Sequence, residues 1–169
     1  MRPVSRLLAI AFSVLFVGLS GAVLTGCDDN GESVAAPVVS VEQIDPADQQ
    51  AFVRQMVGKY LLLSTELQKQ YQAYKAADDA DGFVDYRNSS WTPEYIDTKN
   101  AYEKVFYNQK AYIYRNQLDG LFDLFFALHK LSVHLKHSLL QQDWALEQQA
   151  LQKLAQNQAE VNAYLLLEP

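Results

Sequence analysis

Cysteine and positive charge are both scarce in this chain. Its 169 residues include one cysteine, and 14 Lys and Arg stand against 20 Asp and Glu, for a formal charge of −6. A single cysteine excludes an intramolecular disulfide, a CxxC redox pair and any zinc site built on two or more thiolates. The acidic balance argues against a nucleic-acid partner, because binding to DNA or RNA requires a basic surface.

The common catalytic signatures are also missing. The chain contains neither a Gly-x-Ser-x-Gly elbow nor a His-Glu-x-x-His pair, and it lacks the Glu-x-x-His motifs of ferritin-like metal sites. We therefore expect a protein that is not an enzyme and binds no cofactor, and an envelope hydrolase is the least favoured function. At 49% hydrophobic and 20% charged residues, the chain is nevertheless apolar enough to fold as a single domain.

Residues 1–26 have the layout of a signal peptide. Arg2 and Arg6 form a basic start, and the run Leu7–Val23 carries no charge. The next four residues, Leu24, Thr25, Gly26 and Cys27, resemble the lipobox of bacterial lipoproteins. This resemblance implies cleavage before Cys27, a diacylglycerol on its thiol and an acyl chain on the freed amino group. An uncleaved membrane helix is the alternative, and both leave the protein tethered to a membrane.

The resemblance also bears on location. Two or three acyl chains make a permanent anchor, so Cys27 is expected to hold the protein on the cell membrane, facing the periplasm. Asp28 and Asp29 resemble the signal that retains lipoproteins of enteric bacteria in the inner membrane, while the outer membrane stays possible. Residues 27–44 are predicted to form the lipidated cysteine and a flexible tether. Its seventeen residues from Asp28 to Ile44 could span roughly 55 Å when fully extended and about 23 Å as a coil.

Residues 45–169 are predicted to form an all-α domain. Asp45-Pro46 and Thr92-Pro93 are typical helix starts, Asp143 can cap a further helix, and apolar residues recur every three or four positions. No β pattern competes, so the chain is expected to fold as an antiparallel bundle of about four helices. The expected helices cover residues 46–77, 92–118, 121–140 and 144–167, with a loop over 78–91 and a break at Asp119-Gly120.

Two segments invite a metal-binding interpretation. Asp79–Asp85 resembles the middle of an EF-hand loop, but Ala77 and Asn88 occupy the positions of its two end ligands, so a turn is favoured. His129, His134 and His137 share one predicted helix, and the last two could face the same way. We expect a solvent-facing polar surface there rather than a metal site or a contact with a partner.

Aromatic residues crowd the first half of the predicted domain. Tyrosine suits an interface because it buries its ring while its hydroxyl stays in water, although the same residues could simply pack between helices. The leading hypothesis is a membrane-anchored accessory or binding subunit of an envelope system with an unidentified protein partner. The alternative is a sensor of a small ligand or ion that uses the tyrosine-rich side. The candidate interface consists of Tyr71, Tyr74, Tyr86, Trp91, Tyr95 and Tyr102.

Overall fold

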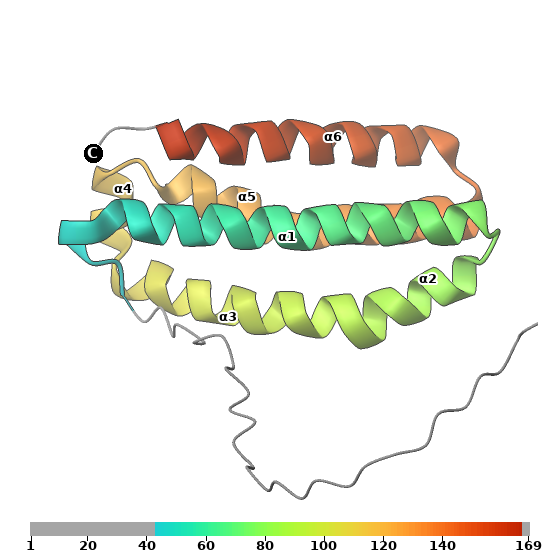
Figure 1. Cartoon of the computed structure of the whole chain (residues 1–169), viewed down its shortest axis with the longest axis horizontal. Coiled ribbons are helices and arrows are strands. Elements are labelled where there is room, and N and C mark those ends of the chain that lie inside the picture. Colours follow the sequence, from blue (N-terminus) through green and yellow to red (C-terminus); the bar gives the residue numbers. More distant parts are fainter. Residues whose placement is uncertain (1–42, 167–169) are drawn as a thin grey trace, which may run out of the picture. The chain divides into compact units, whose positions relative to one another are not determined.

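The computed structural model describes residues 43–166, and all the regular structure in this range is helical. The longer helices run antiparallel along a common axis, which confirms the predicted all-α bundle (Figure 1). The elements are a 3₁₀ turn η1 (Pro46–Asp48), α1 (Gln49–Ala76), α2 (Ala80–Tyr86), a π-helical turn η2 (Arg87–Trp91), α3 (Thr92–Asn108), α4 (Lys110–Arg115), α5 (Asp119–Gln141), α6 (Trp144–Ala163) and a 3₁₀ turn η3 (Tyr164–Leu166).

Two of the three predicted helix starts, at Asp45 and Asp143, are formed by side-chain caps. The start predicted at Thr92-Pro93 is wrong in this respect, because the helical chain runs into α3 from η2 and no side chain caps it there. The Asp45 carboxylate accepts a hydrogen bond from the Ala47 amide at 2.9 Å, and Asp48 accepts from Ala51 at 3.1 Å. Asp143 caps α6 in the same way, accepting from the Leu146 amide at 2.9 Å. Such caps satisfy amide groups that have no partner inside the helix, so these starts depend on local chemistry alone.

The loop predicted over residues 78–91 is wrong, because most of this segment is helical. Asp79 caps α2 by accepting from the Gly82 amide at 2.9 Å, and the chain continues through η2 into α3 without a turn. The π-helical turn lies just before Pro93, whose ring and missing N–H disfavour a regular α-helix at this point. The wider turn accommodates the proline, and the α2–α3 arm bends there (Figure 1).

The predicted boundary between the second and third helices is also displaced. α3 ends at Asn108 rather than at Leu118, and α4 follows as a separate short helix. Asp119 and Gly120 are the first residues of α5, so the chain reverses before them, at Gln117, which has a left-handed φ of 55°. Gly120 serves packing instead: a Cβ there would lie 2.4 Å from the Tyr164 hydroxyl oxygen.

α5 supplies much of the hydrophobic core, as its apolar first half predicts. Phe122, Phe125 and Leu128 are fully buried, and α5 packs along α1, α2, α3 and α6. Around it, Tyr102 and Phe125 meet edge to face with ring centroids 4.9 Å apart, a favourable arrangement for aromatic pairs. The domain therefore buries enough apolar surface to fold without a disulfide or metal.

Ile44, the last residue assigned to the tether, belongs instead to the folded domain. Its side chain is buried, and the Gln109 side-chain amide binds its backbone from both sides. The Ile44 amide donates to Gln109 Oε1, and Gln109 Nε2 donates to the Ile44 carbonyl oxygen at 2.9 Å. The chain is thus fixed at the end of the bundle where α3 meets α4. None of the described helices is long and apolar enough to cross a membrane.

Candidate functional site

The lipobox residues and Asp28 and Asp29 lie outside the described residues, so the predicted anchor has no structural account. The candidate aromatic interface lies inside them, and four of its six members are core residues. Tyr71, Trp91, Tyr95 and Tyr102 are each less than 5% exposed. They fill the space between α1, α5 and the arm formed by α2, η2 and α3, so the prediction that they form a surface for a partner is wrong. Tyr74 and Tyr86 are partly exposed and lie beside each other near α2.

The metal interpretations find no support in the described part of the chain. No group of three His, Cys, Asp or Glu side chains there could hold a metal ion. Asp79 is used as the α2 cap described above, in place of the predicted turn. His134 and His137 are partly exposed on α5, whereas His129 directs its buried Nδ1 into the domain and its Nε2 toward Arg87.

The most unusual polar feature is Arg87, which is only 5% exposed and has no carboxylate partner within the described residues. It projects from η2 toward α5. Its Nε donates to Ser132 Oγ at 3.0 Å, its Nη1 donates to Asn88 Oδ1 at 2.9 Å, and its Nη2 lies 3.4 Å from His129 Nε2. Burial lowers the pKa of Arg87. Buried charges are normally paired, so this guanidinium leaves an uncompensated positive field at the α3–α5 side of the bundle.

His129 is oriented by this arginine. A guanidinium can only donate hydrogen bonds, so Nε2 is the acceptor and the proton of the neutral ring is on Nδ1. Nδ1 is buried and has no hydrogen-bond partner among the described residues. Burial lowers the pKa of His129, and the neighbouring charges of Arg87 and Lys99 lower it further. The ring therefore stays neutral near pH 7 and offers one N–H donor.

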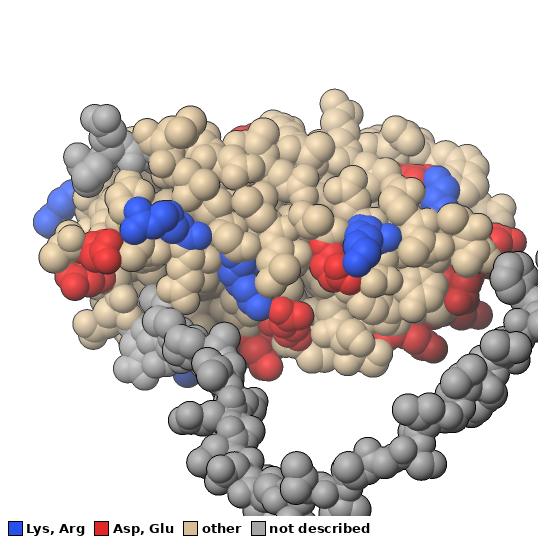
Figure 2. Space-filling view, in the orientation of Figure 1, with Lys and Arg blue, Asp and Glu red and all other residues tan. Residues whose placement is uncertain are grey.

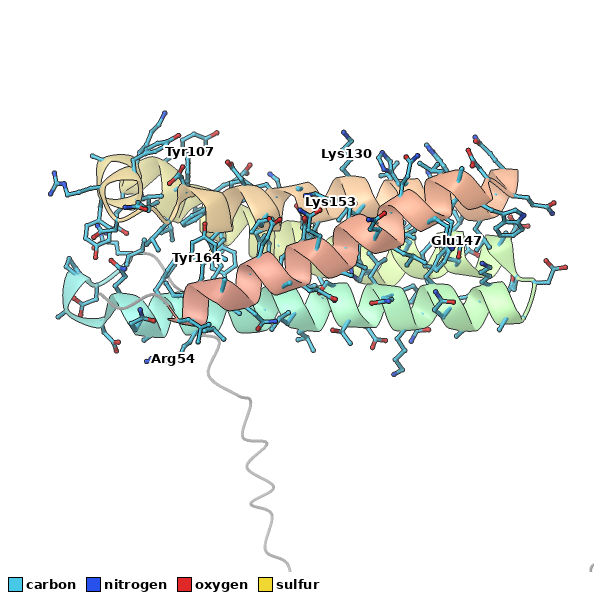
Figure 3. The ribbon with its side chains drawn as sticks, turned by 90° about the horizontal axis from the view of Figure 1, so that it is seen from above. Arg54, Tyr107, Lys130, Glu147, Lys153 and Tyr164 are labelled. Carbon is cyan, nitrogen blue, oxygen red and sulfur yellow. The ribbon has the colours of Figure 1, made fainter. Side chains whose placement is uncertain are left out.

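Beside His129, a groove of about 470 Å³ runs between α3 and α5. This volume lies within the range of small-molecule sites. Lys99 stands over the Phe126 ring, 5.6 Å from its centroid, and also pairs with Glu103 on its own helix. Lys130 points away from the bundle into solvent (Figure 3). The lining residues are Tyr95, Ile96, Lys99, Phe126, His129, Lys130, Val133 and His134, and no carboxylate is among them.

A second groove, of about 560 Å³, lies on the other side of α5, toward α6 and η3. Its lining mixes Lys153 with Asp123 and Glu160, so it does not favour a ligand of either charge. The α3–α5 groove differs because its ionisable side chains are lysines and histidines. It combines an apolar floor with positive charge in a chain that is acidic overall.

Arg87 and Lys99 are the site residues that the sequence reasoning did not single out. Arg87 falls in the segment predicted to be a loop, whose Asn and Ser residues concealed its helical period. Phe83, Arg87, Trp91 and Tyr95 recur every four residues, a spacing that indicates a continuous helical face. With that helix recognised, Arg87 would be expected on the buried side.

Comparison with known proteins does not indicate a function for this chain. No family model, no curated protein and no solved structure matches this chain. The function must therefore be argued from the chain's own residues.

Proposed function

We propose that this protein is a lipid-anchored, non-enzymatic binding protein of the bacterial envelope, and that the α3–α5 groove is its ligand-binding site. The anchor rests on the lipobox resemblance of Leu24 to Cys27. The binding function rests on one observation, the cation-lined apolar groove in an otherwise acidic chain.

The groove favours an anionic amphiphile. Phe126, Ile96 and Val133 offer apolar surface for a hydrocarbon or aromatic body, while Lys130 supplies positive charge at its edge. Lys99 also lines the groove, but its charge is paired with Glu103. The buried Arg87 strengthens the local positive potential, since no carboxylate neutralises it. Carboxylates and phosphates are the groups that such donors bind best.

The buried serine hydroxyls of α5 are used in hydrogen bonds within this helix. Ser132 Oγ donates to the His129 carbonyl oxygen at 2.7 Å, and Ser138 Oγ donates to the Leu135 carbonyl oxygen at 2.8 Å. Their protons are thus engaged with the backbone of α5 and not directed at a base. A nucleophilic serine would need such a base within hydrogen-bond reach.

Charge reversal at Lys130 should weaken binding of anionic amphiphiles. We expect dodecyl phosphate and laurate to bind the wild type more tightly than dodecyltrimethylammonium, and Lys130→Glu to lower the affinity for both anions about tenfold at low salt. Isothermal titration calorimetry below the micelle concentration measures this. Lys153→Glu is the matched control, because it makes the same change of net charge on α6.

Two results would contradict the groove assignment. One is equal affinity for the cationic and anionic amphiphiles, which would leave only nonspecific apolar binding. The other is an equal loss in Lys130→Glu and Lys153→Glu, which would reflect the net charge of the protein rather than its groove.

The anchor is tested separately. Cys27→Ala should abolish incorporation of radiolabelled palmitate and leave the signal peptide uncleaved, because the modified cysteine is the residue at which cleavage occurs in lipoproteins. Gel mobility and fractionation of cells that express the wild type and the variant measure both effects. Normal palmitate labelling of Cys27→Ala would refute the lipid anchor.

A further inference from the structure

One end of the helical domain carries exposed aromatic residues beside basic ones. Tyr107 is 72% exposed and Tyr114 is 51% exposed, and both contact the partly buried Phe106 ring. Lys110 stands over the Tyr114 ring, 5.8 Å from its centroid. Tyr107 lies at the surface of this end (Figure 3). Exposed tyrosines and lysines of this kind suit the boundary between water and lipid headgroups.

Charge is distributed unevenly along the bundle. At the aromatic end, Lys104, Lys110 and Arg115 form no ion pair with any described carboxylate. The carboxylates Asp119, Asp123 and Glu160 of this end lie around Tyr164, on the side formed by α5, α6 and η3. The opposite end, where α1 meets α2 and α5 meets α6, is acidic, and part of its negative charge is visible in Figure 2. Its aspartates are Asp78, Asp79, Asp81, Asp85 and Asp143.

The chain leaves the domain at the aromatic end, since Gln109 fixes Ile44 there. Seventeen residues run from Asp28 to Ile44, and a coil of this length has a typical span of about 23 Å. A lipid on Cys27 would hold the aromatic end close to the bilayer at a high effective concentration, so a weak surface interaction is enough to orient the domain. The acidic end would be repelled by anionic headgroups.

We infer that the surface formed by Tyr107, Lys110, Tyr114 and Arg115 contacts the anionic surface of the membrane, so that the domain stands on its α3–α4 end. This inference rests on the proposed anchor. In this orientation the acidic end points away from the bilayer. The tyrosines lie at headgroup depth and the basic side chains contact lipid phosphates.

The test uses the full-length lipidated protein in vesicles of phosphatidylethanolamine and phosphatidylglycerol. Tyr107→benzoylphenylalanine carries the photoreactive group at the aromatic end, and Trp144→benzoylphenylalanine is the matched control. Trp144 is 52% exposed at the acidic end, so both variants should fold. After irradiation, mass spectrometry should find about fivefold more phospholipid adduct at position 107 than at 144, and Lys110→Glu with Arg115→Glu should reduce that adduct severalfold.

The outcomes separate the two proposals. Equal adduct at positions 107 and 144, or none at 107, in protein that carries lipid on Cys27 would overturn the membrane-facing surface and leave the anchor intact. Protein whose N-terminal peptide lacks lipid would overturn the anchor and this orientation together.

Discussion

Trp91→Ala should lower the free energy of unfolding of the helical domain by about 4 kcal/mol, the range expected for truncating a fully buried large aromatic side chain. Trp91 is 2% exposed and stacks on Tyr95 with ring centroids 5.2 Å apart. Its Nε1 donates to the Leu63 carbonyl oxygen of α1 at 2.9 Å. Trp91→Ala removes the buried ring, its stacking on Tyr95 and its hydrogen bond to α1. It also leaves the Leu63 carbonyl without this donor, at the point where the bent α2–α3 arm meets α1.

Urea unfolding followed by circular dichroism measures the effect, and the chain supplies its own control. Trp144, the second tryptophan, is 52% exposed and contacts mainly Lys75, whose Nζ lies 4.6 Å from the ring centroid. Trp144→Ala should therefore cost less than about 1 kcal/mol. The loss in free energy of unfolding for Trp91→Phe should lie between those of Trp91→Ala and Trp144→Ala, because phenylalanine keeps an aromatic ring but lacks the indole N–H. A loss below 1 kcal/mol for Trp91→Ala would place this residue outside the core.

The parts of the fold that the sequence predicts well are those decided locally. Asp45, Asp48 and Asp143 cap helices whatever the rest of the chain does, and the three-and-four spacing of α1, α5 and α6 is strong. The number of antiparallel arms follows from these helices. The anchor prediction also depends on a local pattern, the basic start, apolar run and lipobox of residues 1–27, and it stays a prediction because these residues lie outside the described range.

The parts that were missed depend on tertiary contacts. Residues 80–91 are rich in Asp, Asn and Ser, which favour turns in isolation, but burying Phe83 and Trp91 against α1 and α5 outweighs that preference. α3 ends where Gln109 turns to bind the backbone of Ile44, a residue 65 positions away. Arg87 likewise contacts His129, a groove residue 42 positions away, and no local pattern predicts that contact.

Because several tyrosines are buried in the core, the domain is expected to unfold cooperatively at alkaline pH. Burial raises the pKa of Tyr60, Tyr95 and Tyr102 to about 12, while an unfolded tyrosine ionises near 10. Between these values the unfolded chain has released protons that the folded chain still holds, so stability is full below pH 10 and is lost as pH rises toward 12. Each residue accounts for roughly 2 kcal/mol by pH 12, and the three together approach the whole stability of a typical domain.

Helix content by circular dichroism should therefore be lost with a midpoint between about pH 11 and 12, and the part of the phenolate absorbance that comes from the buried tyrosines should rise over the same range. Tyr102→Phe removes one of the ionising groups from the core, so its transition should shift to higher pH and become less steep. Tyr107→Phe is the matched control, because Tyr107 is 72% exposed and its removal should leave the transition unchanged. If phenolate absorbance from the buried tyrosines rose near pH 10 while helix content stayed intact, these side chains would be open to water and the core assignment would fail. If instead helix content falls as the phenolate absorbance of the buried tyrosines rises, ionisation of the core tyrosines is coupled to global unfolding, and the aromatic residues first considered as an interface are the residues that hold the bundle together.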